Sequence, residues 1–276
     1  MISMDLLTRK MLPRLMCAAT LAYVPAINAQ TTLLSDSFAV DANNNNPNFE
    51  ISNGRQGGTQ AASQYTYNGN VQVGHTGVDF GQPGGAANGN FMLLAQGSWA
   101  YNNLALNDAL LNGSPLSVSF NIYTGVYSGT SPGDWLSFAI GNFGTSGNPW
   151  PTSNNFGLIV HQNGGLDVFD GGTDVFSQGA GYVTSSAWTE VFSGAGGTGS
   201  PLDGATQVSL YNGASLIDKF NLTTGLNSGD QLGFFAYNSM IGGVGNLDIE
   251  TTPEPTTLAL AGLGLAALLV SRRRKS

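Results

Sequence analysis

Apolar residues recur at every second position through much of the chain. The segments 116–122, 136–140 and 156–160 show this spacing, with Leu, Val, Phe and Ile separated by smaller or polar residues. A period of two places alternate side chains on opposite faces of a β-strand, so each segment has one apolar face for a core. The pattern predicts half-buried strands and argues against a mainly helical fold.

Turn residues separate these segments at short intervals, and Gly-Gly and Asn-Gly pairs favour tight hairpins. Two hairpins are predicted: 156–160 joined to 166–168 through Gly-Gly at 164–165, and 208–210 joined to 216–220 through Asn-Gly at 212–213. Strands at 231–237 and 245–250 end the series. The only segment with helical spacing, 104–111, is too short to change the fold class.

The composition agrees with many short strands. Glycine supplies 39 of 276 residues and charged residues only 9%, against roughly 25% charged residues in an average soluble protein. Glycine favours turns, and few charges disfavour long surface helices. We therefore predict an all-β fold, a two-sheet antiparallel jelly-roll sandwich.

The body of the chain is acidic. Between residues 30 and 255 the only basic side chains are Arg55 and Lys219, whereas acids occur throughout. Nucleic acid is not expected as a partner, because its binding requires several Lys or Arg side chains to neutralise phosphates. An acidic polysaccharide would need a bridging divalent cation for the same reason.

The first 29 residues are predicted to be a secretory signal peptide. Basic residues precede an apolar run from Leu15 to Val24, and the small residue Ala29 marks the expected cleavage site. The alternative is a short transmembrane helix, but the run falls below the roughly 20 residues of a span. Cys17, the only cysteine, lies in this leader, so the mature chain would contain no disulfide.

The C-terminus is predicted to form a short hydrophobic helix. Residues 256–271 carry no charge, and as a helix they would extend about 24 Å at 1.5 Å per residue, close to the roughly 30 Å of a hydrocarbon core. A basic cluster follows, which would hold the extreme C-terminus on the cytoplasmic side. Its members are Arg272, Arg273, Arg274 and Lys275.

Pro253, Glu254 and Pro255, followed by the apolar helix and the basic cluster, resemble the PEP-CTERM sorting signal that exosortase enzymes recognise. The resemblance implies an exported protein that resides transiently in the inner membrane, is processed near 253–255, and reaches the cell surface or extracellular matrix. An ordinary tail anchor after a proline-rich hinge is the alternative. The predicted organisation is a signal peptide (1–29), a sandwich domain (30–250) and a sorting signal (251–276).

The body also resembles concanavalin-like, laminin-G-like jelly rolls. Segments 35–40, 54–67 and 242–250 stand where such domains place a first strand, an early loop and a last strand. The resemblance implies the sandwich fold.

No convincing catalytic set is present, so we do not expect an enzyme. Glycoside hydrolases of this superfamily carry three carboxylates at alternating strand positions, but Asn246 stands at the first of the corresponding positions, before Asp248 and Glu250. An amide cannot serve as the nucleophile or retaining partner. His161 is predicted to be a sheet-surface residue. A diverged glycosidase or lyase remains the enzymatic alternative.

Calcium is the one cofactor for which the sequence offers oxygen ligands. Asp167, Asp170 and Asp174 lie within eight residues of one another beside glycines, and an Asp- and Asn-rich segment covers 41–46. Neither has EF-hand spacing, and solvated turn residues are the alternative interpretation. Two histidines and no cysteine in the mature chain disfavour structural zinc.

Aromatic residues near polar ones are the candidates for carbohydrate binding. Trp150, Trp99 and Tyr101 are the predicted contacts, because a flat amphipathic ring can pack on a sugar. A place in the core is the alternative for each of these rings. Trp135 and Trp188 are expected in the core. The sequence thus favours a non-catalytic surface or matrix protein that binds a neutral polysaccharide, with a purely structural matrix component as the alternative.

Overall fold

The computed structural model describes residues 30–36, 38, 48–50, 65–74, 91–124, 133–143, 147–182 and 187–252. All of these belong to one compact unit, Gln30–Thr252. The predicted leader and sorting tail, and the segments 41–46 and 54–64, lie outside the described residues. No helix within the described ranges is long and apolar enough to cross a membrane.

Strands account for nearly all of the regular structure, which confirms the all-β prediction. The two short helices are α2 (Asp108–Leu111), capped by the Asn107 side chain, and the 3-10 turn η1 (Pro151–Ser153). The strands are β1 (Thr31–Asp36), β2 (Asn48–Glu50), β3 (Tyr65–Gly74), β4 (Phe91–Asn102), β5 (Leu116–Tyr123), β6 (Trp135–Gly141), β7 (Phe156–His161), β8 (Leu166–Asp170), β9 (Thr173–Gln178), β10 (Ala187–Ser193), β11 (Thr206–Asn212), β12 (Ser215–Leu222), β13 (Gln231–Tyr237) and β14 (Ile241–Thr251).

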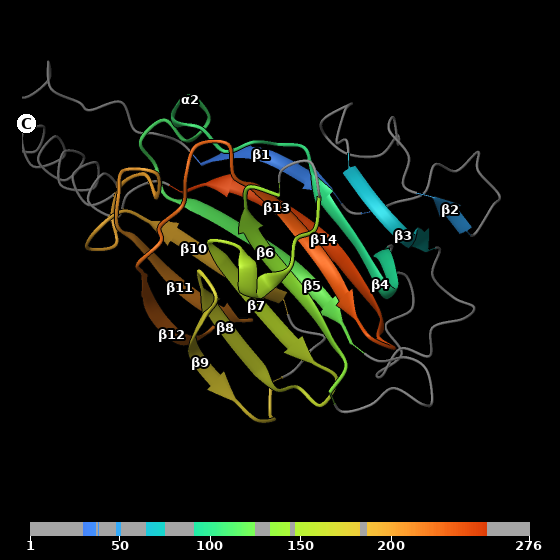
Figure 1. Ribbon diagram of the computed structural model, residues 1–276. Coiled ribbons are helices and arrows are strands. Elements are labelled where there is room, and N and C mark those ends of the chain that lie inside the picture. Colours follow the sequence, from blue (N-terminus) through green and yellow to red (C-terminus); the bar gives the residue numbers. More distant parts are fainter. Residues whose placement is uncertain are drawn as a thin grey trace, which may run out of the picture. The chain divides into compact units, whose positions relative to one another are not determined.

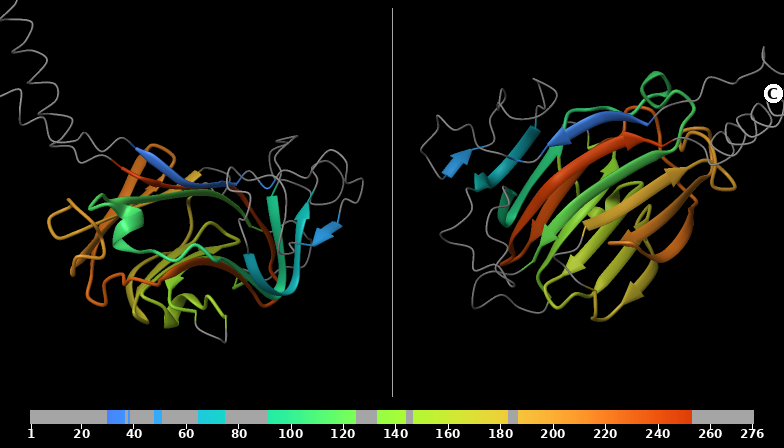
Figure 2. Two further views of the ribbon diagram at one scale, coloured as in Figure 1. Left: turned by 90° about the horizontal axis from the view of Figure 1, so that it is seen from above. Right: turned by 180° about the vertical axis from the view of Figure 1, so that it is seen from behind.

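The strands form two antiparallel layers (Figure 1 and Figure 2, left). The first layer has the order β12-β11-β10-β5-β14, with β1 paired to β14, and the second has the order β9-β8-β7-β6-β13-β4-β3-β2. Strand β4 joins them, because its first half pairs with β14 and its second half with β13. The sandwich is therefore hydrogen-bonded across one side, and its other side ends in the edge strands β9 and β12.

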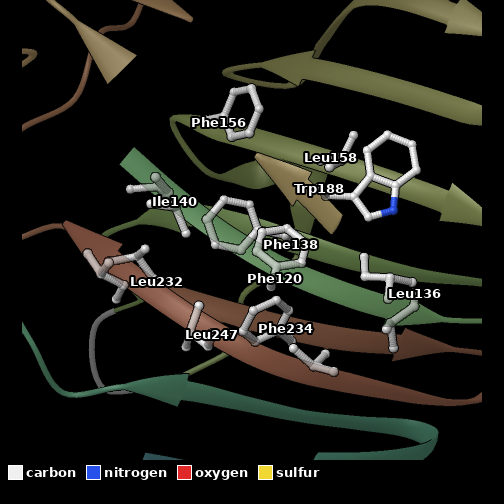
Figure 3. Close-up of a cluster of buried hydrophobic side chains, with 14 of the residues drawn as sticks. Phe120, Leu136, Phe138, Ile140, Phe156, Leu158, Trp188, Leu232, Phe234 and Leu247 are labelled. Atoms are coloured by element: carbon white, nitrogen blue, oxygen red, sulfur yellow. The ribbon is translucent and has the colours of Figure 1, made fainter. Parts of the chain in front are cut away.

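The core lies between the two layers, and the apolar residues predicted to face it do so. Burial alternates strictly along β5, with the apolar residues inside. Phe120 and Phe138, from opposite layers, have ring centroids 4.8 Å apart, and Phe234 lies within 5.4 Å of both (Figure 3). Each such side chain contributes roughly 1.5–3 kcal/mol when fully buried, so this cluster holds the layers together.

Both predicted hairpins are confirmed as β7–β8 and β11–β12. The prediction was incomplete for β6, which is buried on both faces instead of one. Its second face carries Trp135, Ser137 and Ala139, and Trp150 packs on Trp135 and Phe143 on Ala139. The edge strand β12 is largely exposed: Leu216, in the predicted hairpin strand 216–220, is 48% exposed.

Asp170 closes the open side of the sandwich. It ends β8 in the second layer, and its carboxylate accepts hydrogen bonds from the backbone and hydroxyl groups of Thr223 and Thr224, which follow β12 in the first layer, at 2.5–3.2 Å. Burial alone would raise the pKa of Asp170, but the hydrogen bonds from Thr224 and Thr223 outweigh it and lower the pKa. A ring contact between Phe176 and Phe220, 5.7 Å between centroids, supports the same edge.

Candidate functional site

Aromatic side chains gather on the outer face of the second layer, turned away from the core. We call this surface the aromatic face. Strand pairing places Trp99 beside Phe235, and Tyr237 beside Trp135, which in turn pairs with His161 on β7. Its rings are Trp99, Tyr101, Trp135, Phe143, Trp150, Phe169, Phe235 and Tyr237.

Three of these rings form the most compact part of the face. Trp135 and Tyr237 stack with centroids 4.7 Å apart and planes 9° from parallel. Trp150 meets both rings edge-on, at 5.4 Å from Trp135 and 5.6 Å from Tyr237. Edge-to-face and stacked pairs at these distances are favourable beyond their buried area. Tyr237 is 39% exposed, so this cluster reaches solvent.

Trp99 and Tyr101 extend the face along β4. Their rings stack with centroids 5.8 Å apart, and Tyr101 also packs against Phe143 at 5.2 Å. Trp99 is half-buried and also contacts the cluster of Trp135 and Phe235. The structure thus brings together Trp99, Tyr101 and Trp150, the three positions predicted from the sequence for carbohydrate contact.

Small residues on the strands make room for the segment that carries Trp150. A side-chain β-carbon at Gly157 would lie 2.3 Å from the Pro151 carbonyl oxygen, and one at Gly233 would lie 2.7 Å from Pro149. Real β-carbons essentially never approach other atoms this closely. Glycine at both positions is therefore what allows the described part of segment 142–155 to lie directly on the sheet.

Local hydrogen bonds fix the orientation of Trp150. Its indole nitrogen donates to the Thr152 hydroxyl at 2.8 Å, and the Asn154 side chain donates to its carbonyl at 2.7 Å. Pro151 follows at the first position of η1, where its fixed φ favours the turn. Trp150 is half-buried, less exposed than its loop position suggests, and is held in one orientation as a rigid contact surface.

Polar groups lie beside the aromatic rings. His161 Nε2 lies 2.7 Å from Asp167 Oδ2, and Ser177 donates to Asp167 Oδ1 at 2.6 Å. The carboxylate lies between the hydroxyl and the imidazole, so His161 is not placed to accept the Ser177 proton, as nucleophilic catalysis would require. About a quarter of the His161 and Asp167 side chains is exposed, which leaves them accessible for hydrogen bonds to a ligand.

None of the described residues on the aromatic face is a Lys or Arg. Within the described ranges the only Lys or Arg is Lys219, which belongs to the edge strand β12 of the other layer. Asp167 and the buried Asp134, which accepts a hydrogen bond from Asn238, stand at the end of the face near His161. The face thus offers rings, hydrogen-bonding groups and negative charge.

The structure does not bring the three predicted calcium ligands together. Asp167 lies on the outer face with His161, Asp170 binds Thr223 and Thr224 between the layers, and Asp174 accepts the backbone N–H of Phe176 on β9. Among the described residues, no group of three or more His, Cys, Asp or Glu could hold a metal ion. Calcium binding therefore stays a prediction from the sequence alone.

The acids considered for catalysis lie on the other layer. Asp248 and Glu250 occupy β14, where Glu250 accepts hydrogen bonds from Gln30 and Thr32. Asn246 sits in a bulge with φ 49° and donates to Asn121. Their strand borders β1 and β5, and the aromatic face belongs to the other layer.

Sequence reasoning missed several members of the aromatic face. Phe235 and Tyr237 were recognised only as parts of a strand. Trp135 is buried as expected, at 7% exposed, but in a second cluster with Ile159 and Phe235, apart from the core between the layers. The sequence did contain a signal. On β6 and β13, the alternate positions that point away from the core between the layers include Trp, Phe, Tyr, Gly and Ala, where an exposed strand would carry polar residues. Such a pattern indicates a strand that is covered on both faces.

Comparison with known proteins confirms the sorting signal. Residues 251–275 match the PEP-CTERM protein-sorting motif. No curated protein sequence matches the chain.

Several solved structures resemble the chain in backbone arrangement. Peanut lectin with a bound nonapeptide is 12% identical, with 81% of this chain and 97% of that chain covered at a TM-score of 0.44. Arcelin-5, a lectin-like defense protein from Phaseolus vulgaris, is 10% identical, with 82% and 99% covered and a TM-score of 0.44. The carbohydrate recognition domain of Emp46p is 13% identical, with 74% and 96% covered and a TM-score of 0.45.

Proposed function

We propose that this protein, which carries a PEP-CTERM sorting motif, is an exported, non-catalytic surface or matrix protein that binds a neutral polysaccharide on the aromatic face. The observation that carries the proposal is the packing of Trp99, Trp150 and Tyr237 on one aromatic cluster with Trp135, whose neighbour on β7 is His161, the partner of Asp167. Flat rings supply apolar contact area for the C–H groups of a sugar, and the polar pair supplies hydrogen bonds to hydroxyls.

Charge favours a neutral glycan over an acidic one. A uronate or sulfate on the ligand would meet Asp167 with no Lys or Arg beside it among the described residues. Like charges placed together lower affinity, and screening by salt only partly relieves this. Hydroxyl groups carry no such penalty.

Sorting is proposed to follow from the C-terminal motif. Cleavage near Pro253, Glu254 and Pro255 by an exosortase would release the sandwich from the inner membrane, while residues 272–275 hold the tail on the cytoplasmic side. The intact mass of the mature protein from its native host should then lack both the first 29 residues and everything after about residue 255. A mass that includes the tail would contradict the proposed processing.

Binding is tested by affinity electrophoresis of the protein in gels that contain either neutral or uronate-rich polysaccharides. We expect retardation by at least one neutral polymer, little by uronate polymers, and no release of reducing sugar or unsaturated uronate. Loss of retardation with EDTA would support the calcium prediction. Failure to bind any neutral polymer would overturn the proposed function and favour the structural alternative, whereas product release would favour an enzyme.

A further inference from the structure

Glu190 is a fully buried acid in the middle of β10. Its side chain is 0% exposed and faces the core between Trp188 and Phe192. Among the described residues, neither carboxyl oxygen has a hydrogen-bond partner on another residue, and the nearby indole nitrogen of Trp188 has none either. A carboxylate without a partner in an apolar core is among the least favourable arrangements in a folded protein.

The described elements packed around Glu190 place no Lys, Arg or His beside it. The strands beside β10 place Val118 and Leu210 next to Glu190. The layer opposite contributes apolar residues such as Phe156, whose ring lies 5.0 Å from that of Phe192. Two titratable residues lie beside this part of the core. Asp170 pairs with Phe156, and its carboxylate is engaged by the two threonines; Tyr182 packs its ring on Trp188 while its hydroxyl donates to Gln178.

The position of β10 determines how water could reach Glu190. Only β11 and β12 separate it from the open edge, and β12 packs mainly through Phe220 and Leu222 near its end. On its other side, β5 is paired along its length with β14. Separating β10, β11 and β12 from β7, β8 and β9 at this edge would solvate the carboxylate, and it requires breaking the hydrogen bonds that Thr223 and Thr224 donate to Asp170.

We propose that Glu190 is a proton-dependent latch: the layer β10-β11-β12 stays packed against β7-β8-β9 while Glu190 is protonated, and it opens from the edge between β9 and β12 when the proton is lost to solvent. This inference does not depend on the proposed carbohydrate function.

The direction of the pH dependence follows from burial. Burial raises the pKa of Glu190 well above its ordinary value of 4.5, opposed only in part by the backbone N–H of the same residue. At pH values between the ordinary and the raised pKa of Glu190, the carboxyl is ionised in the open form but still protonated in the closed form. Stability is therefore complete below about 4.5 and falls as pH rises. One released proton makes the opening constant increase about tenfold per pH unit in this interval.

Hydrogen–deuterium exchange of the full chain from pH 5 to pH 9, corrected for intrinsic exchange, tests the latch. We expect protection in 206–222 to fall as pH rises, by about tenfold per pH unit as long as the pH is below the raised pKa of Glu190, while 231–237 stays protected. Glu190→Gln, which cannot ionise, should remove this loss, and Glu190→Met serves as a second neutral variant if the glutamine variant folds poorly. Glu250→Gln, an acid on the outer face of the same layer, should leave the loss unchanged.

Equal protection of 206–222 at both ends of the pH range would overturn the latch. So would the same pH dependence in the Glu190→Gln or Glu190→Met variant, because the titrating group would then lie elsewhere.

Discussion

Replacing Gly157 by alanine is expected to lower the free energy of unfolding by about 3 kcal/mol, the upper end of the range for overpacking, and to abolish carbohydrate binding. The new β-carbon would lie 2.3 Å from the Pro151 carbonyl oxygen and 2.7 Å from its carbonyl carbon. Both are backbone atoms, so no side-chain rotation can relieve the clash. The segment with Pro151 must move off the sheet and take Trp150 with it.

Gly179→Ala is the matched control, because a β-carbon there meets no atom within 4 Å. Urea unfolding and affinity electrophoresis on both variants separate loss of stability from loss of binding. A Gly157→Ala protein as stable as the native chain would show that the segment does not lie on the sheet as described.

Removing the rings of Trp99 and Trp150 together is expected to weaken neutral-glycan binding by at least about 30-fold, which corresponds to roughly 2 kcal/mol, the cost of losing a single aromatic hot spot. Both indoles are half-buried at the surface of a sheet, so Trp→Ala leaves the core between the layers intact. Isothermal titration with the polymer selected by electrophoresis measures the change.

Tyr211→Ala provides the control for this experiment. Tyr211 is a half-buried aromatic on β11, in the other layer. Its removal should change the affinity less than twofold. If Tyr211→Ala weakens binding as much as the two tryptophan substitutions do, the ligand does not use the aromatic face in particular.

The fold could be predicted because the residues that face the core recur at every second position of a strand. Leu116, Val118, Phe120 and Ile122 face one core without interruption, and local turn chemistry at 164–165 and 212–213 determines where the chain reverses. Such information is local, because a strand is predicted from the alternation of apolar and polar residues within it, and a hairpin from the residues of its turn.

The pairing of distant strands could not be predicted in this way. Strand β4 leaves β14 and joins β13 at a bend near Gly97, where φ is 80°. A glycine permits such a bend, but it does not specify which strand is the next partner. The aromatic face depends on this bend, because β4 contributes Trp99 and β13 contributes Phe235.

Glu190 illustrates a second limit. The sequence WTEVF shows an acid between two core positions, yet the same alternation would suit an exposed strand end. Burial depends on β5, β11 and the opposite layer all presenting apolar residues to one point. Only the tertiary structure reveals that no other described residue donates a hydrogen bond to the carboxyl.

The most direct test of the carbohydrate proposal uses the indole N–H signals of the four tryptophans in a 1H–15N spectrum. Each signal is assigned by a single Trp→Phe substitution, and the protein is then titrated with an oligosaccharide of the polymer that it binds. We predict that the Trp99 and Trp150 signals shift on titration, while that of Trp188, 0% exposed in the core, does not. Binding that leaves both the Trp99 and Trp150 signals unchanged would contradict the proposed role of the aromatic face.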